Sequence, residues 1–209
     1  VEQHRDNTRV LRDAHAKAHG CVKAEMTVLQ NLVPELRHGV LAEPGKTWCV
    51  LPPMVRRLMH DLPHPAFVLN LRWDVLGFNA PADALFGFGK HTPERRNLLW
   101  LLFTDPALHA RFHEWEAQAP LMLSSFRRDF ARATQEADIH ELVDELERVS
   151  PEFKAWWRTH DVHASCNGVR KMVINGQAEP FEHTSLTVDE DRHLRLVVYA
   201  QQLKTADGE

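Results

Sequence analysis

The chain of 209 residues is long enough for one domain, and its 44% of apolar residues suffice to bury a core, which excludes a disordered chain. Its 25 basic and 29 acidic residues give a net charge of −4 at pH 7, which excludes DNA binding by bulk positive charge. It contains no apolar run of about 18 residues, and residues 1–12 are polar. We therefore expect a cytoplasmic protein without a membrane span or signal peptide.

Residues 1–49 differ from the rest of the chain in composition and hydropathy pattern, which predicts a separate N-terminal extension. Apolar and polar side chains alternate over residues 21–29, which predicts a half-buried strand. We expect a domain boundary near residue 50, a main domain over residues 50–203 and a flexible tail over residues 204–209.

The main domain opens with a predicted helix and a predicted β-hairpin. Pro52-Pro53 starts an amphipathic helix that ends before Pro63, and its apolar face carries Met54, Val55, Leu58 and Met59. Two apolar runs follow, over residues 66–71 and 73–78, and only one polar residue separates them. This pattern predicts the two strands of a hairpin.

Helices are predicted in the middle of the chain, where three strong start signals occur. Each signal places a side-chain oxygen at the N-cap and a proline at the first helical position. The signals are Thr92-Pro93, Asp105-Pro106 and Ser150-Pro151. The predicted helices cover residues 93–103, 106–118, 121–134, 139–149 and 151–160.

Strands return at the C-terminal end of the main domain. Residues 169–174, 181–188 and 193–203 alternate or run apolar, and Asn175-Gly176 and residues 189–191 favour turns between them. A hairpin, a helical middle and closing strands predict an α+β fold in which several helices cover a single antiparallel sheet.

Aromatic side chains concentrate in the main domain, which holds five of the six tryptophans and all ten phenylalanines. Within it, residues 97–103 are apolar on nearly all sides, as expected of a helix inserted between two layers. Two interpretations stay open: a filled core, or an apolar cavity that holds a ligand.

Basic and amide side chains next to these apolar segments are candidates for holding the polar head of a ligand. They are Arg95, Arg96, Asn97, Arg127 and Arg128. The rigid fork of an arginine side chain suits a carboxylate. The alternative is that these side chains are solvated or pair with neighbouring acidic residues.

The sequence shows no pattern typical of an active site or a metal centre. Three histidine pairs with four-residue spacing lack the H-E-x-x-H glutamate and an obvious third ligand, so we expect surface histidines. These pairs are His15/His19, His60/His64 and His109/His113. A G-x-S-x-G elbow and a glycine-rich phosphate loop are absent. The cysteines are too scattered for a disulfide framework; they are Cys21, Cys49 and Cys166. We therefore expect no enzyme and no metal.

Several segments of the main domain together carry a family resemblance. They are residues 65–69, 73–80, 84–87, 94–103, 142–146, 150–157, 160–162 and 196–199, with Trp115 and Arg127. Through them the chain resembles the MmyB-like transcription-regulator ligand-binding domain over about residues 50–203. The resemblance implies a PAS-like fold that senses small apolar or fatty-acid-like molecules, normally behind an N-terminal helix-turn-helix.

This sequence departs from the family pattern at two places. Residues 1–49 contain no pair of short helices with a glycine turn and no basic recognition helix, so we expect no direct DNA binding from this chain. Residues 174–180 stand where the family usually has a His-Pro and Val-Gly segment, at the expected rim of the pocket.

Residues 1–48 resemble a truncated start of the catalase-related haem-protein core. The resemblance rests on residues 12–25, 36–41 and 43–47, and it implies that His15 is a distal haem histidine. The likeness stops near Thr47, and the one tyrosine, Tyr199, lies in a predicted strand rather than on the helix that would carry a proximal ligand.

Three hypotheses about function follow. The first is a sensor that binds an amphipathic, fatty-acid-like molecule and responds by a change in self-association, as a homodimer, or in partner docking. The residues expected at its site are Phe67, Trp73, Phe78, Leu99, Phe103, Trp115 and Phe126, with Arg96, Asn97 or Arg127 at the polar head. The second is a haem-binding remnant that uses His15, and the third is a regulator fragment without activity. Trp156 and Trp157 either form a dimer face or pack under the sheet.

Overall fold

A computed structural model of the chain describes residues 50–133, 136–159, 168–189 and 193–202. All of these residues belong to one compact unit, Ala42–Glu209. The strand predicted over residues 21–29, residues 190–191 of the predicted turn, the tail over 204–209, the three cysteines and His15 lie outside the described residues.

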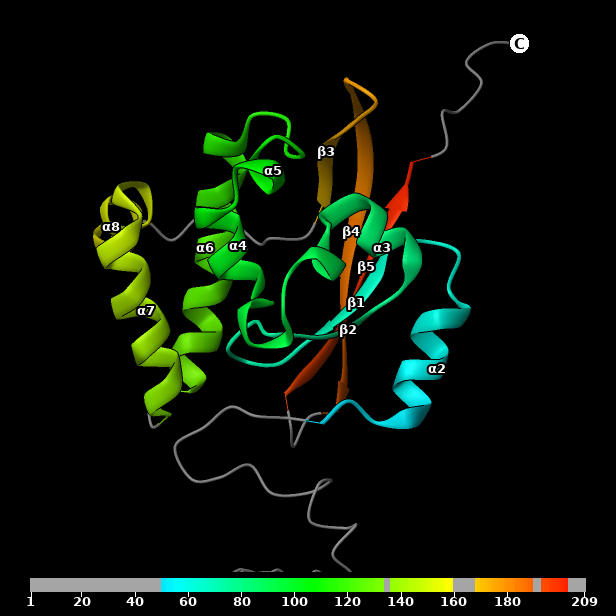
Figure 1. Cartoon of the computed structure of the whole chain (residues 1–209), viewed down its shortest axis with the longest axis horizontal. Coiled ribbons are helices and arrows are strands. Elements are labelled where there is room, and N and C mark those ends of the chain that lie inside the picture. Colours follow the sequence, from blue (N-terminus) through cyan, green and yellow to red (C-terminus); the bar gives the residue numbers. More distant parts are fainter. Residues whose placement is uncertain (1–49, 134–135, 160–167, 190–192, 203–209) are drawn as a thin grey trace, which may run out of the picture. The chain divides into compact units, whose positions relative to one another are not determined.

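The described residues form an antiparallel sheet and a set of helices (Figure 1). The strands are β1 (Ala66–Leu69), β2 (Val75–Phe78), β3 (Gly168–Ile174), β4 (Gln177–Asp189) and β5 (Leu194–Gln201). The helices are α2 (Pro53–Asp61), α3 (Ala80–Phe86), α4 (Leu98–Thr104), α5 (Pro106–His109), α6 (Trp115–Arg132), α7 (Ala137–Val149) and α8 (Pro151–Arg158). Single 3₁₀ turns are η2 (Phe88–Lys90) and η3 (Pro93–Arg95).

The five strands form one sheet in the order β2-β1-β5-β4-β3, and each neighbouring pair is antiparallel. The first strand of the domain therefore pairs with the last one, with Phe67 opposite Val197. The α+β, PAS-like fold class predicted from the sequence, with a single antiparallel sheet covered by helices, is confirmed.

Both faces of the sheet are apolar, and one is covered by more helices than the other. Successive side chains of a strand point to opposite faces, so Phe67 and Leu69 join the large cluster with the helices from α3 onward, whereas Ala66 and Val68 pack on the α2 side. In Figure 1, α2 lies on one side of the sheet, and α4, α6, α7 and α8 lie on the other.

The helix α2 is less buried than its pattern predicts. Of the four apolar residues expected on its inner face, only Met59 is fully buried, while Met54 and Leu58 are 74% and 52% exposed. The helix therefore contacts the sheet mainly through one end of its apolar stripe.

The turn between β3 and β4 is confirmed at Asn175-Gly176. Both residues have positive φ, 51° and 80°, as a two-residue type I′ hairpin requires. Glycine meets this requirement without steric cost, and asparagine tolerates it better than most residues.

Asn97 begins α4, which corrects the prediction of a helix over residues 93–103. Only residues Pro93–Arg95 form a single 3₁₀ turn after Thr92. Arg96 and Asn97 are then non-helical, because the Val75 N–H donates to the Arg96 carbonyl and Asp74 forms a β-bridge with Asn97. Pairing with the strand hairpin thus overrides the local helix signal at Thr92.

The predicted break near residues 118–121 is also wrong. The helix α6 is continuous from Trp115 to Arg132 with Pro120 inside it. The break lies instead at residues 111–113, where the His113 N–H donates to the Lys171 carbonyl and Phe112 forms a bridge with Met172 of β3. Backbone pairing with a distant strand ends the helix there, which no local residue pattern indicates.

The helix α3 was not predicted, although its sequence carries standard signals. Asn79 caps its first turn by accepting a hydrogen bond from the Ala82 N–H, and Gly87 ends it with φ of 72°. Helices α7 and α8 begin and end within two residues of their predicted bounds, and the Ser150 hydroxyl caps α8 through the Phe153 N–H, as predicted.

Candidate ligand-binding site

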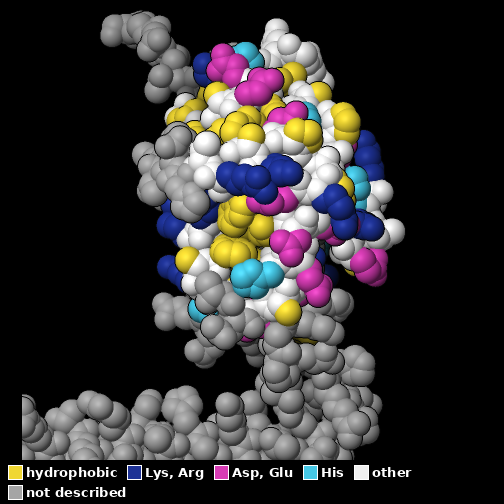
Figure 2. Space-filling model, turned by 90° about the vertical axis from the view of Figure 1, so that its left-hand side faces the viewer, with side chains coloured by type: hydrophobic (Ala, Val, Ile, Leu, Met, Phe, Trp, Pro, Cys, Tyr) yellow, Lys and Arg dark blue, Asp and Glu magenta, His cyan; other side chains and the backbone are white. Residues whose placement is uncertain are grey.

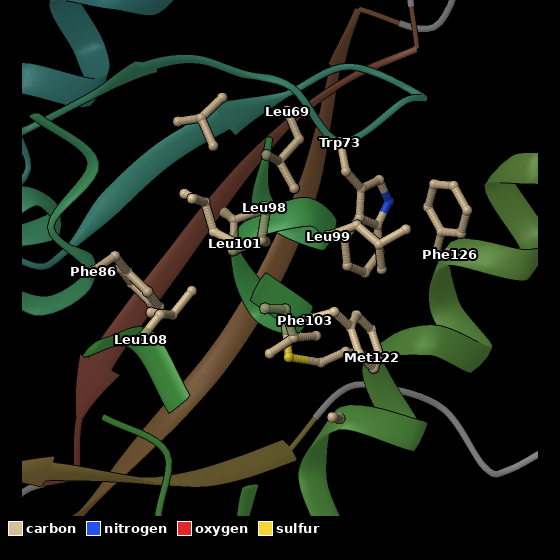
Figure 3. Packing of buried hydrophobic residues seen from close by; sticks show 14 of the residues in the cluster. Leu69, Trp73, Phe86, Leu98, Leu99, Leu101, Phe103, Leu108, Met122 and Phe126 are labelled. Carbon is tan, nitrogen blue, oxygen red and sulfur yellow. The ribbon is translucent and has the colours of Figure 1, made fainter. Parts of the chain in front are cut away.

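An apolar layer separates one face of the sheet from the helices and is the place where the sequence predicts a ligand. Its buried members come from β1, β5 and the helices α4 and α6. They include Phe67, Leu69, Val197, Leu99, Leu102, Phe103, Met122, Leu123 and Phe126. Figure 3 shows Leu99, Phe103, Met122 and Phe126 gathered between α4 and α6, next to Trp73.

The predicted lining residues fall into two groups. Trp73 and Phe126 meet edge to face, with ring centroids 5.6 Å apart, and Phe103 meets Trp115 in the same way at 5.9 Å. Phe67 instead lies near α3, where its ring meets those of Phe86 and Phe88, and Phe78 lies against the same Phe88 ring. The structure thus brings the first four residues to the α4 and α6 side and places Phe67 and Phe78 at the opposite end of the layer.

Arg96 holds the backbone of the segment that follows α3. Its guanidinium donates from Nε to the Phe88 carbonyl at 3.0 Å and from Nη2 to the His91 carbonyl at 2.8 Å. The same group lies over the Phe78 ring, 4.9 Å from the ring centroid. In this conformation its Nε and Nη2 donate hydrogen bonds to the backbone of the segment between α3 and η3.

Asn97 is the N-cap of α4 and ties this helix to the β1–β2 turn. It is buried, and its side-chain oxygen accepts from the Trp100 N–H. The amide nitrogen donates to the Arg72 carbonyl at 2.8 Å and to Asp74 Oδ1 at 2.9 Å. The oxygen and the nitrogen of the side-chain amide therefore both have hydrogen-bond partners within the chain.

Arg127 projects from α6 to the C-terminal end of α8. Its Nη2 donates to the Trp156 carbonyl and, at 3.1 Å each, to the carbonyls of Trp157 and Thr159. The last carbonyls of a helix have no partner within the helix, so Arg127 supplies the missing donors. Its guanidinium also lies 5.3 Å from the ring centroid of Trp157.

A polar cluster of Trp73, Asp129 and Arg195 lies where the hairpin turn, α6 and β5 meet; the first two residues are buried and the Arg195 side chain is 20% exposed. The Trp73 indole N–H donates to Asp129 Oδ2 at 2.7 Å, and Arg195 Nη2 lies 2.6 Å from the same oxygen. The guanidinium of Arg195 lies 5.7 Å from the Trp73 ring centroid. Asp129 is only 3% exposed, so its charge depends on these two partners.

Trp73 has an unusual backbone in this cluster. Its φ is 69°, in the left-handed region that bulky residues rarely adopt. The turn is held by Asp74, whose carboxylate accepts from Asn70 Nδ2 at 2.9 Å and from Arg72 Nη1 at 2.7 Å. The strained turn thus fixes the direction in which the indole enters the layer.

Asp129 and Arg195 were not predicted as site residues. A usable signal exists for both, because each charged residue shares a face with apolar residues: Asp129 follows Met122 and Phe126 along α6, and Arg195 precedes Val197 and Tyr199 on one face of β5. A charge at such a position is either paired or functional.

Trp156 and Trp157 pack within the helical layer. The Trp157 ring stacks on Phe153 at 5.6 Å, and Trp156 contacts Phe103 and Trp115. These contacts agree with the packing interpretation of the pair, although the partner rings belong to helices rather than to the sheet.

Tyr199, the tyrosine weighed as a haem ligand, lies within β5. It is 1% exposed, and its ring contacts Phe67, Phe86 and His183. Within the described part of the chain, no three His, Cys, Asp or Glu side chains are grouped as metal ligands would be.

Charges on the surface alternate in sign on the face shown in Figure 2, where basic and acidic side chains lie beside apolar ones. This mixture agrees with the small net charge of −4. None of the described helices is both long enough and apolar enough to cross a membrane.

One comparison with known proteins agrees with the resemblance seen in the sequence of the main domain. Residues 51–209 match the family described as the MmyB-like transcription regulator ligand binding domain. No curated protein matches the chain, and neither comparison supports the catalase resemblance of residues 1–48. Because the family match covers most of the sequence, the chain belongs to the MmyB-like transcription regulator ligand-binding domains.

Proposed function

We propose that this domain senses an amphipathic small molecule of the fatty-acid class, bound between the sheet and helices α4 and α6. The observation that carries the proposal is the composition of this layer. Aliphatic and aromatic side chains line it from both sides, and the polar cluster Trp73-Asp129-Arg195 lies at one end. A molecule with an apolar chain and a single polar head matches such a surface.

Helix α4 is well placed to respond to an occupant. Five of its seven residues are buried, so it has apolar contacts on most of its circumference. Met122 of α6, which faces the same layer in Figure 3, has a flexible thioether side chain that adapts to irregular shapes. Both features support a layer that repacks around an acyl chain.

The proposed output is a change in self-association or in docking to a partner. A ligand shifts such an equilibrium only through different affinities for the two states. A chain inserted between α4, α6 and the sheet changes the position of α4, and Asn97 joins α4 to the β1–β2 turn at one edge of the sheet. The domain therefore acts by binding and not by catalysis.

The first test is native mass spectrometry of the purified full chain, followed by denaturation and lipid extraction. We expect a fatty acid or a similar amphiphile to copurify, and a panel of fatty acids to raise the melting temperature of the stripped protein. Recovery of haem would support the alternative that uses His15. A ligand-free mass with no thermal shift across the panel would contradict the proposal and favour a domain without activity.

A further inference from the structure

Arg195 has an unused pair of donors inside the apolar layer. Within the described residues, its Nε and Nη2 atoms are buried and have no hydrogen-bond acceptor in suitable geometry. Asp129 Oδ2 approaches Nη2 to 2.6 Å, so the ion pair exists, but the contact is off the N–H direction. The N–H groups of Nε and Nη2 point the same way and form the edge of the fork that binds a carboxylate with two parallel hydrogen bonds.

Ser185 adds a second unused polar group on the same face of the sheet. Arg195 pairs with Thr187 and Val197 pairs with Ser185, so Ser185 is the diagonal neighbour of Arg195 across β4 and β5. Side chains in this relation lie about 7–8 Å apart at their Cβ atoms and reach a common group. The Ser185 hydroxyl is buried and, within the described part of the chain, has no hydrogen-bond partner.

An unmet donor in a buried place costs free energy unless a partner arrives. Here two such groups, from neighbouring strands, lie on the sheet face that borders the apolar layer, since Val197 between them belongs to that layer. The arginines predicted as head-group residues differ in this respect, because Arg96 and Arg127 donate to backbone carbonyls of the chain itself.

We propose that the Nε–Nη2 edge of Arg195, with the Ser185 hydroxyl, binds the carboxylate of the ligand, so that the domain selects an acid over an uncharged amphiphile of equal length. This inference rests on the proposed function. Asp129 and Trp73 are positioning residues: the carboxylate of Asp129 pairs with Nη2 of the guanidinium, and the Trp73 ring lies beside the guanidinium, 5.7 Å from it by ring centroid. The ligand carboxylate would supply the hydrogen-bond acceptor that Nε and Nη2 lack within the described residues.

The test compares dodecanoic acid with 1-dodecanol on the stripped full chain at pH 8, by isothermal titration calorimetry. We expect the wild-type protein to bind the acid about tenfold to a hundredfold more tightly than the alcohol, as charge-assisted hydrogen bonds give. Arg195→Gln, which keeps much of the side-chain volume, should abolish this preference and leave the affinity for the alcohol unchanged. Ser185→Ala should reduce the preference by a smaller factor.

Two further variants are controls for the loss of an arginine elsewhere in the domain. Arg127→Gln should retain the preference for the acid, and so should Arg56→Gln on the exposed side of α2. If Arg195→Gln fails to fold because Asp129 loses its partner, the double variant Arg195→Gln/Asp129→Asn removes both charges and takes its place. Alcohol binding by each variant verifies that the layer is intact.

The outcomes separate this inference from the proposed function. Equal preference for the acid in the wild type and in Arg195→Gln would overturn the assignment of Arg195 while the binding of amphiphiles stands. Equal affinity of the wild-type protein for the acid and the alcohol would also overturn the assignment of Arg195 and leave the binding of amphiphiles standing. If the wild type binds neither compound, the proposed function itself fails, and the assignment of Arg195 fails with it.

Discussion

Asn79 shows how one side chain joins three elements of this fold. Its side-chain oxygen accepts from the Ala66 N–H of β1 and from the Ala82 N–H of α3, each at 3.0 Å. Its amide nitrogen donates to the carbonyls of Leu62 and His64, which follow α2. The residue is 2% exposed, so none of these bonds has water as a ready substitute.

We expect Asn79→Ala to lower the free energy of unfolding by about 3 kcal/mol, because it leaves buried N–H groups of two elements without an acceptor. Urea denaturation followed by tryptophan fluorescence measures the change. Asp105→Ala is the control, because Asp105 caps the start of α5 and its carboxylate otherwise contacts the partly exposed His91 Nε2, at 3.3 Å, so its loss should cost about 1 kcal/mol. Equal losses in the two variants would show that Asn79 is an ordinary helix cap.

The polar residues of the candidate site could be predicted only in part. Trp73, Phe103 and Phe126 were found from the sequence because large aromatic residues in apolar runs are buried. Asp129 and Arg195 are 66 residues apart in the sequence, by subtraction of their numbers, and the contact between them depends on how α6 meets β5. Local patterns carry no information about such a pair.

At the scale of the elements, α8 depends on a residue outside it. Its N-terminal end is capped by its own neighbour, Ser150, but its C-terminal carbonyls are bound by Arg127 of α6. The position of α8 is therefore coupled to α6 by hydrogen bonds, in addition to the packing of Phe126 against Trp157.

We expect Arg127→Ala to destabilise the domain by about 2 kcal/mol, since several carbonyls lose a charged donor. Arg127→Lys should restore little of the loss, because an ammonium group lacks the planar fork. Arg128→Ala is the control, since Arg128 is exposed and donates to Ser125 of its own helix. Thermal unfolding followed by circular dichroism measures all three, and equal losses for Arg127→Ala and Arg128→Ala would contradict the role of Arg127.

The element boundaries were predicted well where local chemistry decides them and poorly where distant backbone pairing decides them. Ser150-Pro151 and Asn175-Gly176 specify a helix start and a turn through their own side chains and backbone. Thr92-Pro93 has the same local signal as Ser150-Pro151, yet the helix starts later, because residues 96–98 pair with the hairpin. Propensity is a weak guide wherever such pairing competes with it.

At the scale of the whole molecule, the pairing of β1 with β5 joins the two ends of the main domain. The two strands are separated by more than a hundred residues, which include the helices that face the apolar layer. We therefore expect the helices between β1 and β5 to fold before these two strands pair, or at the same time. This coupling predicts that occupation of the layer stabilises the domain as a unit.

We expect the purified chain with its bound amphiphile to melt at a higher temperature than the stripped chain. A ligand present at 100 times its dissociation constant adds about 2.7 kcal/mol, which for a chain of this size is a rise of about 5–10 °C. Differential scanning calorimetry before and after lipid removal measures the change, with readdition of dodecanoic acid as the control. Identical melting curves in the three samples would contradict occupation of the layer.

Both edges of the sheet carry a short segment of the chain. Residues 96–98 lie along β2, and residues 111–113 lie along β3, each with a bridge and backbone hydrogen bonds. A strand from another molecule that attempted to extend the sheet would first have to displace them. The same two segments that interrupt the helices thus protect the protein against edge-to-edge aggregation, a hazard of any open antiparallel sheet.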